Sequence, residues 1–90
     1  MTTNTRRLQA LNAPRRIVVE ADADGQPTVA AFGGRRLAVE ARHESWRIDD
    51  EWWRAKPISR RYWRITLEDG RTADVYEDLV GSGWYRQSYA

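Results

Sequence analysis

The residues of this chain that could do chemistry are mainly aromatic and basic, and they are concentrated in one stretch. Ser45–Tyr89 contains all five tryptophans and all four tyrosines, with seven arginines interleaved among them. Aromatic faces can stack on unpaired nucleobases while arginines follow the phosphate backbone, and protein interfaces use the same residue types as anchors. The composition therefore indicates a binding surface and leaves nucleic acid and protein open as partners.

Catalytic groups are sparse by comparison. His43 is the only histidine and cysteine is absent, so neither a second imidazole nor a thiolate exists to complete a metal site. The serines lack a nucleophile-elbow pattern, and no phosphate loop of the GxxxxGK[ST] or GxGxxG type occurs. Asp49, Asp50 and Glu51 could ligate a hard cation, but consecutive acids are also typical of a solvated helix cap. We expect no enzyme activity, no cofactor and no metal.

Length and charge bound the class of protein. The chain has 90 residues, enough for one domain with a modest core. Its net charge of +2 is too small to demand a polyanionic partner. No apolar run approaches the roughly 18 residues of a membrane span, and the first residues lack the apolar stretch of a signal peptide. We expect a soluble, cytoplasmic protein that does not associate with membranes, and its oligomeric state stays open.

Alternation of apolar and polar residues predicts an all-β fold. Six short strands joined by tight turns are typical of an antiparallel meander that closes into a small barrel or a strongly curved sheet. Residues 15–90 form this single domain, and residues 1–14 are predicted to be a flexible N-terminal tail. The predicted strands are Arg15–Ala21, Pro27–Phe32, Arg35–Arg42, Arg60–Leu67, Thr72–Asp78 and Trp84–Tyr89.

Two hairpin registers follow from keeping apolar residues on one face. In the hairpin at Glu68–Gly70, a three-residue loop pairs apolar residues on the inner face and complementary residues on the outer face at the same time. The same rule predicts a three-residue loop with Gly25 left-handed in the first hairpin, which places Val19 opposite Val29. The pairs predicted for the later hairpin are Trp63–Val75 and Ile65–Ala73 inside, and Tyr62–Tyr76, Arg64–Asp74 and Thr66–Thr72 outside.

The third strand is less regular. Leu37, Val39 and Ala41 are predicted to point inward, and Trp46 is predicted to be a core residue. Because Trp46 has the opposite parity to Ala41, the two share a face only if a bulge or break intervenes near His43–Ser45. Whether Ala31 or Phe32 points inward on the second strand depends on the length of the Gly33-Gly34 turn, which stays open.

Asp49–Ile58 interrupts the alternation. Asp49 can cap a short helical turn near 49–54, and Pro57 prevents its continuation. Irregular segments carried on rigid scaffolds often hold function. This loop therefore marks one end of the expected binding surface.

Four segments together resemble a small bacterial domain of unknown function: WRIDDEWWR (Trp46–Arg54), ISRRYWRITLEDGR (Ile58–Arg71), VYEDL (Val75–Leu79) and GWYRQSY (Gly83–Tyr89). That domain is similar to a C-terminal segment found with ImuB-like proteins, which are catalytically inactive relatives of Y-family DNA polymerases in mutagenic translesion synthesis. The chain departs from them in lacking the polymerase-like body and any clamp-binding peptide. The resemblance implies a stand-alone version of an accessory domain that serves DNA damage tolerance, and it transfers no functional residue.

Taken together, these observations predict a non-enzymatic accessory domain in DNA repair. We expect it to contact DNA, single-stranded DNA included, through an aromatic and arginine surface. The alternative is a protein-interaction module of a mutasome-type complex, with translesion-synthesis proteins as partners and no nucleic-acid contact, in which the acidic Asp49–Glu51 repels phosphate. The expected binding residues are Trp52, Trp53, Arg54, Arg61, Tyr62, Arg64 and Tyr76.

Overall fold

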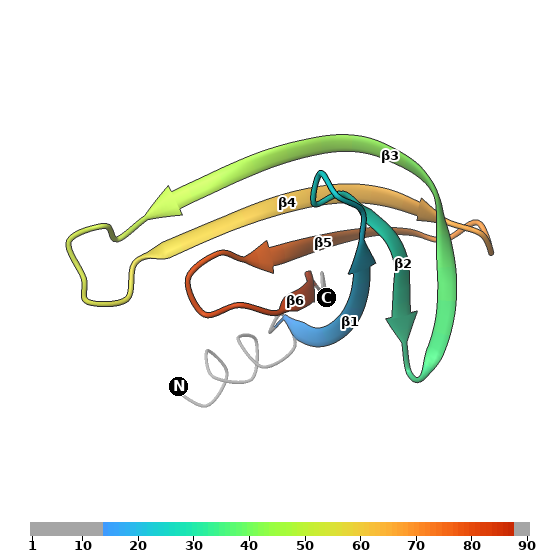
Figure 1. Ribbon diagram of the computed structural model, residues 1–90, viewed down its shortest axis with the longest axis horizontal. Coiled ribbons are helices and arrows are strands. Elements are labelled where there is room, and N and C mark those ends of the chain that lie inside the picture. The colour runs from blue at the N-terminus through green and yellow to red at the C-terminus, as the bar shows by residue number, and fades with distance from the viewer. Residues whose placement is uncertain (1–13, 88–90) are drawn as a thin grey trace, which may run out of the picture.

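The computed structural model describes residues 14–87 and shows six antiparallel strands that close into a small barrel (Figure 1). Neighbouring strands follow chain order, and β1 pairs with β6 to close the barrel. The predicted all-β meander is confirmed. The strands are β1 (Arg15–Ala21), β2 (Pro27–Phe32), β3 (Arg35–Asp50), β4 (Ile58–Leu67), β5 (Thr72–Asp78) and β6 (Trp84–Gln87).

Two sequence predictions concern the ends of the chain. Residues 1–13 of the expected tail and residues 88–90, which include the end of the expected last strand, lie outside the described residues. Among the described residues, no helix has the length and apolarity needed to cross a membrane.

The interior of the barrel receives apolar side chains from all six strands. Ile65 and Val75 at its centre are fully buried, and burial of an aliphatic side chain of this size stabilises a fold by roughly 1.5–3 kcal/mol. The buried cluster consists of Ala30, Leu37, Trp63, Ile65, Leu67, Ala73 and Val75, with Ile17, Val19, Phe32, Val39 and Trp84 packed against it.

The β4–β5 hairpin has the predicted register. Trp63 lies opposite Val75 on the inner face, and Tyr62 lies opposite Tyr76 on the outer face. The backbone amide of Leu67 donates to the carbonyl of Arg71, which leaves a three-residue loop between them. The other predicted pairs, Ile65–Ala73, Arg64–Asp74 and Thr66–Thr72, are also present.

The predicted register of the first hairpin is wrong. Val19 pairs with Ala30 instead of Val29, and a bulge lies between Glu20 and Ala21. The predicted three-residue loop with left-handed Gly25 is present, because the Asp22 amide donates to the Gln26 carbonyl at 2.9 Å and Gly25 has a φ of 80°. The bulge beyond Ala21, which still lies opposite Pro27, is what moves Val19 from Val29 to Ala30. Ala30 therefore enters the core.

The turn after β2 decides which side chain of that strand faces inward. Gly33 and Gly34 form a two-residue turn between Phe32 and Arg35, with φ of 57° and 81°. Both central residues of such a hairpin turn need positive φ, which glycine adopts without steric cost. Phe32 consequently packs against the barrel core.

The third strand is longer than predicted and carries two irregularities. β3 continues to Asp50, with register shifts between Val39 and Ala41 and between Arg42 and Glu44. The bulge expected near His43–Ser45 is thus present. The earlier shift places Ala41 opposite Thr66 on the outer face, so the inward orientation predicted for Ala41 is wrong.

The helical turn predicted near 49–54 is absent from the described structure. Asp49 and Asp50 belong to β3, and a single β-turn follows in which the Arg54 amide donates to the Glu51 carbonyl at 2.9 Å. Glu51 has a φ of 51°, which is incompatible with a right-handed helix. Continued pairing of β3 with β4 removes Asp49 from a capping position, because its backbone is extended and lies opposite Ser59.

Truncation of the core should be far more damaging than truncation of the exposed barrel wall. We expect Ile65→Ala to lower the free energy of unfolding by about 2–5 kcal/mol because it leaves a cavity. Val18→Ala should change it by less than about 0.5 kcal/mol, since Val18 is 70% exposed. Urea denaturation followed by circular dichroism measures both, and equal losses would contradict the assigned core.

Candidate functional site

The structure separates the seven predicted binding residues into three places. Two of them, Trp52 and Trp53, are strongly exposed at the tip of the β3–β4 hairpin, and Arg54 follows in the same turn. Arg61 projects from the opposite face of β4, where it lies across from Glu77 in the strand register. The remaining three, Tyr62, Arg64 and Tyr76, lie on the outer face of β4 and β5.

We call residues 51–54 the hairpin tip. Trp52 is 79% exposed and Trp53 is 65% exposed. Their rings meet edge to face, with centroids 5.7 Å apart and an interplanar angle of 83°. Arg54 lies 3.4 Å from the carboxylate of Glu51 across the turn. The tip therefore presents two large apolar rings at right angles.

The acidic residues beneath the tip are engaged in the local structure. The Asp49 carboxylate accepts a hydrogen bond from Ser59 Oγ at 2.6 Å and pairs with Arg47 Nε at 2.9 Å. The hydrogen bonds from Ser59 and then Arg47 lower the pKa of Asp49 below its ordinary value. The Asp50 carboxylate accepts the backbone amide of Glu51 at 2.7 Å. These acids thus hold the end of the hairpin in place.

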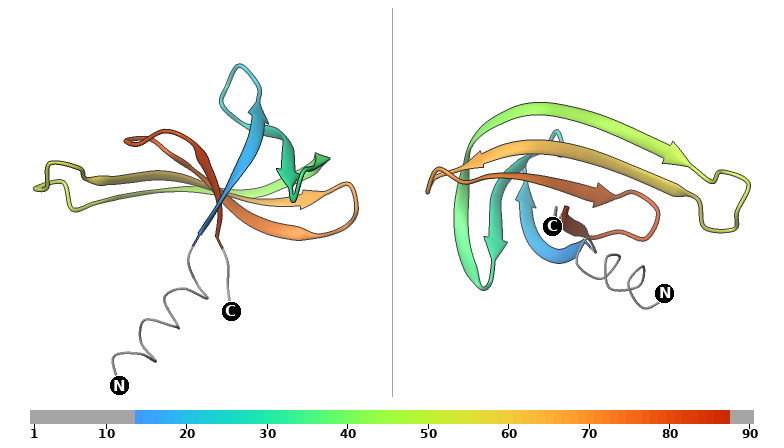
Figure 2. Two further views of the ribbon diagram at one scale, coloured as in Figure 1. Left: turned by 90° about the horizontal axis from the view of Figure 1, so that it is seen from below. Right: turned by 180° about the vertical axis from the view of Figure 1, so that it is seen from behind.

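Further apolar side chains are exposed at the same end of the molecule. Figures 1 and 2 show the β3–β4 and β5–β6 loops extending in the same direction. The backbone amide of Leu79 donates to the carbonyl of Ser59 at 2.8 Å, which joins the second loop to the base of β4. Ile48, Leu79 and Val80 are each between 40% and 45% exposed. Among the described residues, Val18 is the one strongly exposed large apolar side chain away from this end.

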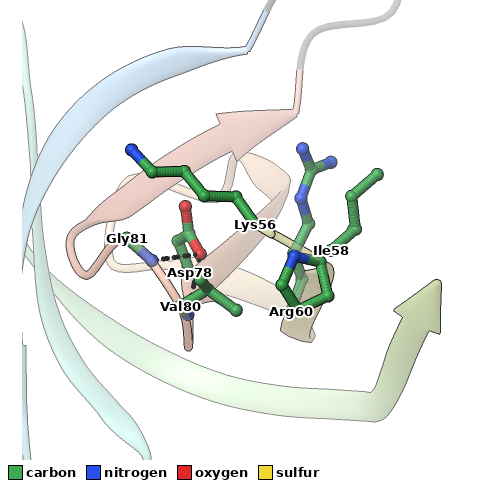
Figure 3. Close-up of a pocket in the computed structure, with 7 residues that line it drawn as sticks. Lys56, Ile58, Arg60, Asp78, Val80 and Gly81 are labelled. Carbon is green, nitrogen blue, oxygen red and sulfur yellow. Dashed lines mark hydrogen bonds between the residues drawn. The ribbon is translucent and has the colours of Figure 1, made fainter. Parts of the chain in front are cut away.

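A pocket of about 370 Å³ lies between the two loops (Figure 3). The Asp78 carboxylate at its wall accepts the backbone amides of Val80 and Gly81, at 3.0 and 2.9 Å. Two basic side chains, Lys56 and Arg60, also line it. The full lining is Lys56, Pro57, Ile58, Arg60, Asp78, Val80 and Gly81.

Four aromatic rings on the outer face form a continuous row, which we call the aromatic ladder. Each of the strands β3, β4, β5 and β6 contributes one ring, and the four residues are cross-strand partners. The ring centroids are 5.3 Å apart for Trp46–Tyr62, 4.9 Å for Tyr62–Tyr76 and 5.3 Å for Tyr76–Tyr85. Trp46, predicted to be a core residue, therefore lies at one end of this outer row.

Stacking within the ladder buries the two middle rings. Tyr62 is 7% exposed and Tyr76 is 2% exposed. The Arg60 guanidinium lies 4.6 Å from the centroid of Tyr76 and donates to the Tyr62 hydroxyl at 3.3 Å. Burial raises the pKa of the Tyr76 phenol. Neither tyrosine offers a free face to a nucleobase.

The electrostatics of Arg60 follow from the same contacts. Burial opposes the charge of its guanidinium. The hydrogen bond to Tyr62, together with the nearby Tyr76 and Asp78, outweighs this effect and raises the pKa of Arg60. The side chain stays cationic beside the pocket.

Arg64 is committed to carboxylates. Its Nε lies 2.9 Å from Asp74 Oδ1 and its Nη2 lies 3.1 Å from Asp74 Oδ2, a two-point contact. Glu44 approaches the same guanidinium at 4.0 Å. Because Asp74 is buried, loss of Arg64 would remove a counter-charge from a carboxylate that is shielded from water. The Arg64 guanidinium is therefore engaged by carboxylates within the fold, which disfavours its binding to a phosphate.

Sequence reasoning missed part of this end of the molecule. It placed no site residue in the β5–β6 loop, although Asp78 followed by Gly81 is a pattern in which a carboxylate caps the amides of a turn. It also missed Trp46 and Tyr85 as members of the ladder. The two register shifts of β3 cancel, so Trp46 lies on the outer face that uninterrupted alternation from Leu37 and Val39 would give it, and the prediction that it is a core residue is wrong.

The role of this site is inferred from its geometry. Comparison of the chain with protein-family models, with curated proteins and with solved structures finds no match. Residues 14–87 contain no group of three or more histidine, cysteine, aspartate or glutamate side chains arranged to hold a metal ion. The arrangement can therefore be read as a set of exposed anchors and a small, partly basic pocket.

The tryptophans of the tip should be dispensable for folding. We expect Trp52→Ala and Trp53→Ala to change the free energy of unfolding by less than about 0.5 kcal/mol. Trp63→Ala should lower it by about 3–5 kcal/mol, because Trp63 is only 7% exposed. Thermal and urea denaturation measure the three variants, and a large loss in the tip variants would show that the rings are structural.

The Asp49–Ser59 contact predicts a change in titration. Replacing Ser59 with alanine should raise the pKa of Asp49 toward its ordinary value, since the Ser59 hydrogen bond is the main cause of the lowering. A carboxyl pKa lowered by folding stabilises the folded state above the unfolded pKa, and this contribution is lost as pH falls through the lowered value. Carbon-13 NMR of the carboxyl group follows the titration. The control Ser45→Ala should leave it unchanged, and an unaltered pKa in Ser59→Ala would refute the assignment.

Proposed function

We propose that this chain is a non-enzymatic interaction domain that binds a partner protein through the Trp52–Trp53 tip. The observation that carries the proposal is the exposure of these rings, 79% and 65%, at the tip of the β3–β4 hairpin. Tryptophan is enriched among the residues that dominate protein interfaces, where the ring fills an apolar pocket of the partner. Contiguous exposed apolar surface of this kind marks interaction sites.

The surroundings of the tip suit a protein partner. Ile48, Leu79 and Val80 are further exposed apolar side chains at the same end of the molecule. The local charges are balanced within the domain, since Asp49 pairs with Arg47 and Glu51 lies beside Arg54. An apolar centre with a polar rim is the usual anatomy of a protein interface.

The same geometry weakens the idea that DNA is bound along the face of the sheet. The middle tyrosines of the ladder are buried, and Arg64 is engaged with Asp74. Arg47 and Arg54 beside the exposed rings lie against Asp49 and Glu51, so the tip offers phosphate no surplus of positive charge. These features favour the protein-interaction alternative over the surface expected from sequence.

Single-stranded DNA is the second candidate, and one observation favours it. Lys56 and Arg60 line the pocket next to the tip, and no ion pair among residues 14–87 includes either side chain. A base could stack on an exposed tryptophan while a phosphate meets Lys56. Such binding would weaken steeply as salt rises, because it releases counterions.

The resemblance of the aromatic segments to the accessory domain of ImuB-like proteins suggests the setting. In this proposal the domain serves DNA damage tolerance, and its partner is another protein of translesion synthesis. The proposal assigns the contact to the hairpin tip and assigns no chemistry to the domain.

Site-specific photo-crosslinking tests which macromolecule meets the tip. A benzophenone-bearing amino acid replaces Trp53, and cells damaged with ultraviolet light are irradiated at the crosslinking wavelength. We expect covalent adducts with one or a few proteins, identified by mass spectrometry, and no adduct with DNA. The physical reason is that the exposed apolar ring lies inside the proposed interface.

The matched control carries the same amino acid at Val18, which is 70% exposed but lies away from the tip. Adducts that form equally at both positions would refute a specific protein interface. Adducts with DNA at position 53, together with salt-sensitive quenching of tryptophan fluorescence by an oligothymidylate, would establish the second candidate instead.

A further inference from the structure

The distal part of β3 has one edge without a strand. Glu44–Asp50 pairs with β4 residue by residue and contains no further bulge. On the other side, the pairing of β3 with β2 reaches only Ala38. Within residues 14–87, no strand pairs with the second edge of Glu44–Asp50, which we call the open edge. Figure 1 shows β3 lying outside β4 and β5 in this part of the sheet.

The aromatic ladder ends at this open edge. Its last ring belongs to Trp46, which is stacked on Tyr62 with an interplanar angle of 5°. Ring centroids along the ladder are separated by 4.9–5.3 Å, close to the distance of about 4.8 Å between neighbouring strands. An aromatic residue on one further strand, placed opposite Trp46, would therefore stack on its outer face.

We propose that the open edge binds an extended peptide segment of a partner protein as an added antiparallel strand, with an aromatic side chain as the fifth ring of the ladder. Backbone amides and carbonyls along the edge supply the hydrogen bonds, and the alternate side chains supply specificity. The open edge adjoins the hairpin tip and includes Ile48, but the proposal depends on the strand edge and on Trp46 and not on Trp52 or Trp53, so it does not rest on the proposed function.

The neighbours of Trp46 define the side chains that the peptide carries. On the outer face of β3, Trp46 is flanked by Glu44, whose side chain is 63% exposed, and by Ile48, which is 42% exposed. In antiparallel pairing, the peptide residue opposite Ile48 comes first and the residue opposite Glu44 comes last. The complementary pattern is apolar–x–aromatic–x–basic, since cross-strand pairs of opposite charge or of apolar side chains stabilise a sheet.

The charged side chains of the open edge bear on which class of partner it binds. Glu44, Asp49 and Asp50 place three carboxylates on this segment, against one guanidinium from Arg47. Arg47 is already paired with Asp49 at 2.9 Å. Arg64 of β4 lies 4.0 Å from Glu44, whose side chain is still 63% exposed. A basic side chain of a peptide can therefore meet the Glu44 carboxylate, whereas a nucleic acid cannot supply a row of backbone amides to the edge.

The test uses the isotope-labelled protein and the synthetic peptide Thr-Val-Thr-Tyr-Thr-Arg-Thr with blocked ends. We expect NMR shift changes at the amides of residues 44–50 and at the indole of Trp46. Replacing the tyrosine of the peptide with threonine, or Trp46→Thr in the protein, should weaken binding about five- to tenfold, the value of one aromatic pair. Val18→Thr serves as the control and should bind normally.

A second variant, with an exchanged charge, tests the proposal even if Trp46→Thr perturbs the fold. Glu44→Lys, at an exposed position, should weaken binding of the arginine peptide and strengthen binding of the same peptide with glutamate in place of arginine. Absence of shift changes at residues 44–50 with millimolar peptide, equal binding of the peptide without tyrosine, or no exchange of preference in Glu44→Lys would overturn the proposal. An oligothymidylate that shifts the Trp46 indole where the peptide does not would also overturn it.

Discussion

The pairing of β4 with β5 is the constraint on which the rest of the structure depends. Trp63 opposite Val75 and Tyr62 opposite Tyr76 assign successive residues of both strands to opposite faces. The inner set fills the barrel, and the outer set begins the aromatic ladder. A slip of one residue would turn the side chains of one strand to the opposite face and would separate Arg64 from Asp74. The barrel core and the aromatic ladder therefore depend on the same strand register.

Much of the fold could be predicted because it follows from local patterns. The β4–β5 hairpin satisfied inner and outer pairs with one loop length, so its register was determined. In the first hairpin the loop length was predicted correctly, but the register beyond it was not, because the bulge between Glu20 and Ala21 leaves no signature in the alternation. The orientation of Ala41 was mispredicted because the first shift in β3 leaves no signature in composition.

The candidate site was only partly predictable. Trp52 and Trp53 lie on an irregular segment, and they are exposed because few neighbouring side chains are available there to cover them. Tyr62 and Tyr76 were expected on the outer face and do lie there. Their burial arises from rings on the neighbouring strands, with Trp46 on one side and Tyr85 on the other. Such burial is a property of four strands together, and no single strand pattern encodes it.

Closure of the barrel has a consequence for how the chain opens. β1 and β6 come from opposite ends of the described chain, and within residues 14–87 their pairing covers Arg15–Ile17, whereas β3 and β4 share a far longer ladder. Bringing such distant segments together carries the largest loop-closure entropy in the fold. Formation of this seam should therefore be the late, slow event in folding. Its reopening should be the first subglobal fluctuation, during which the barrel becomes a curved sheet and its core meets water.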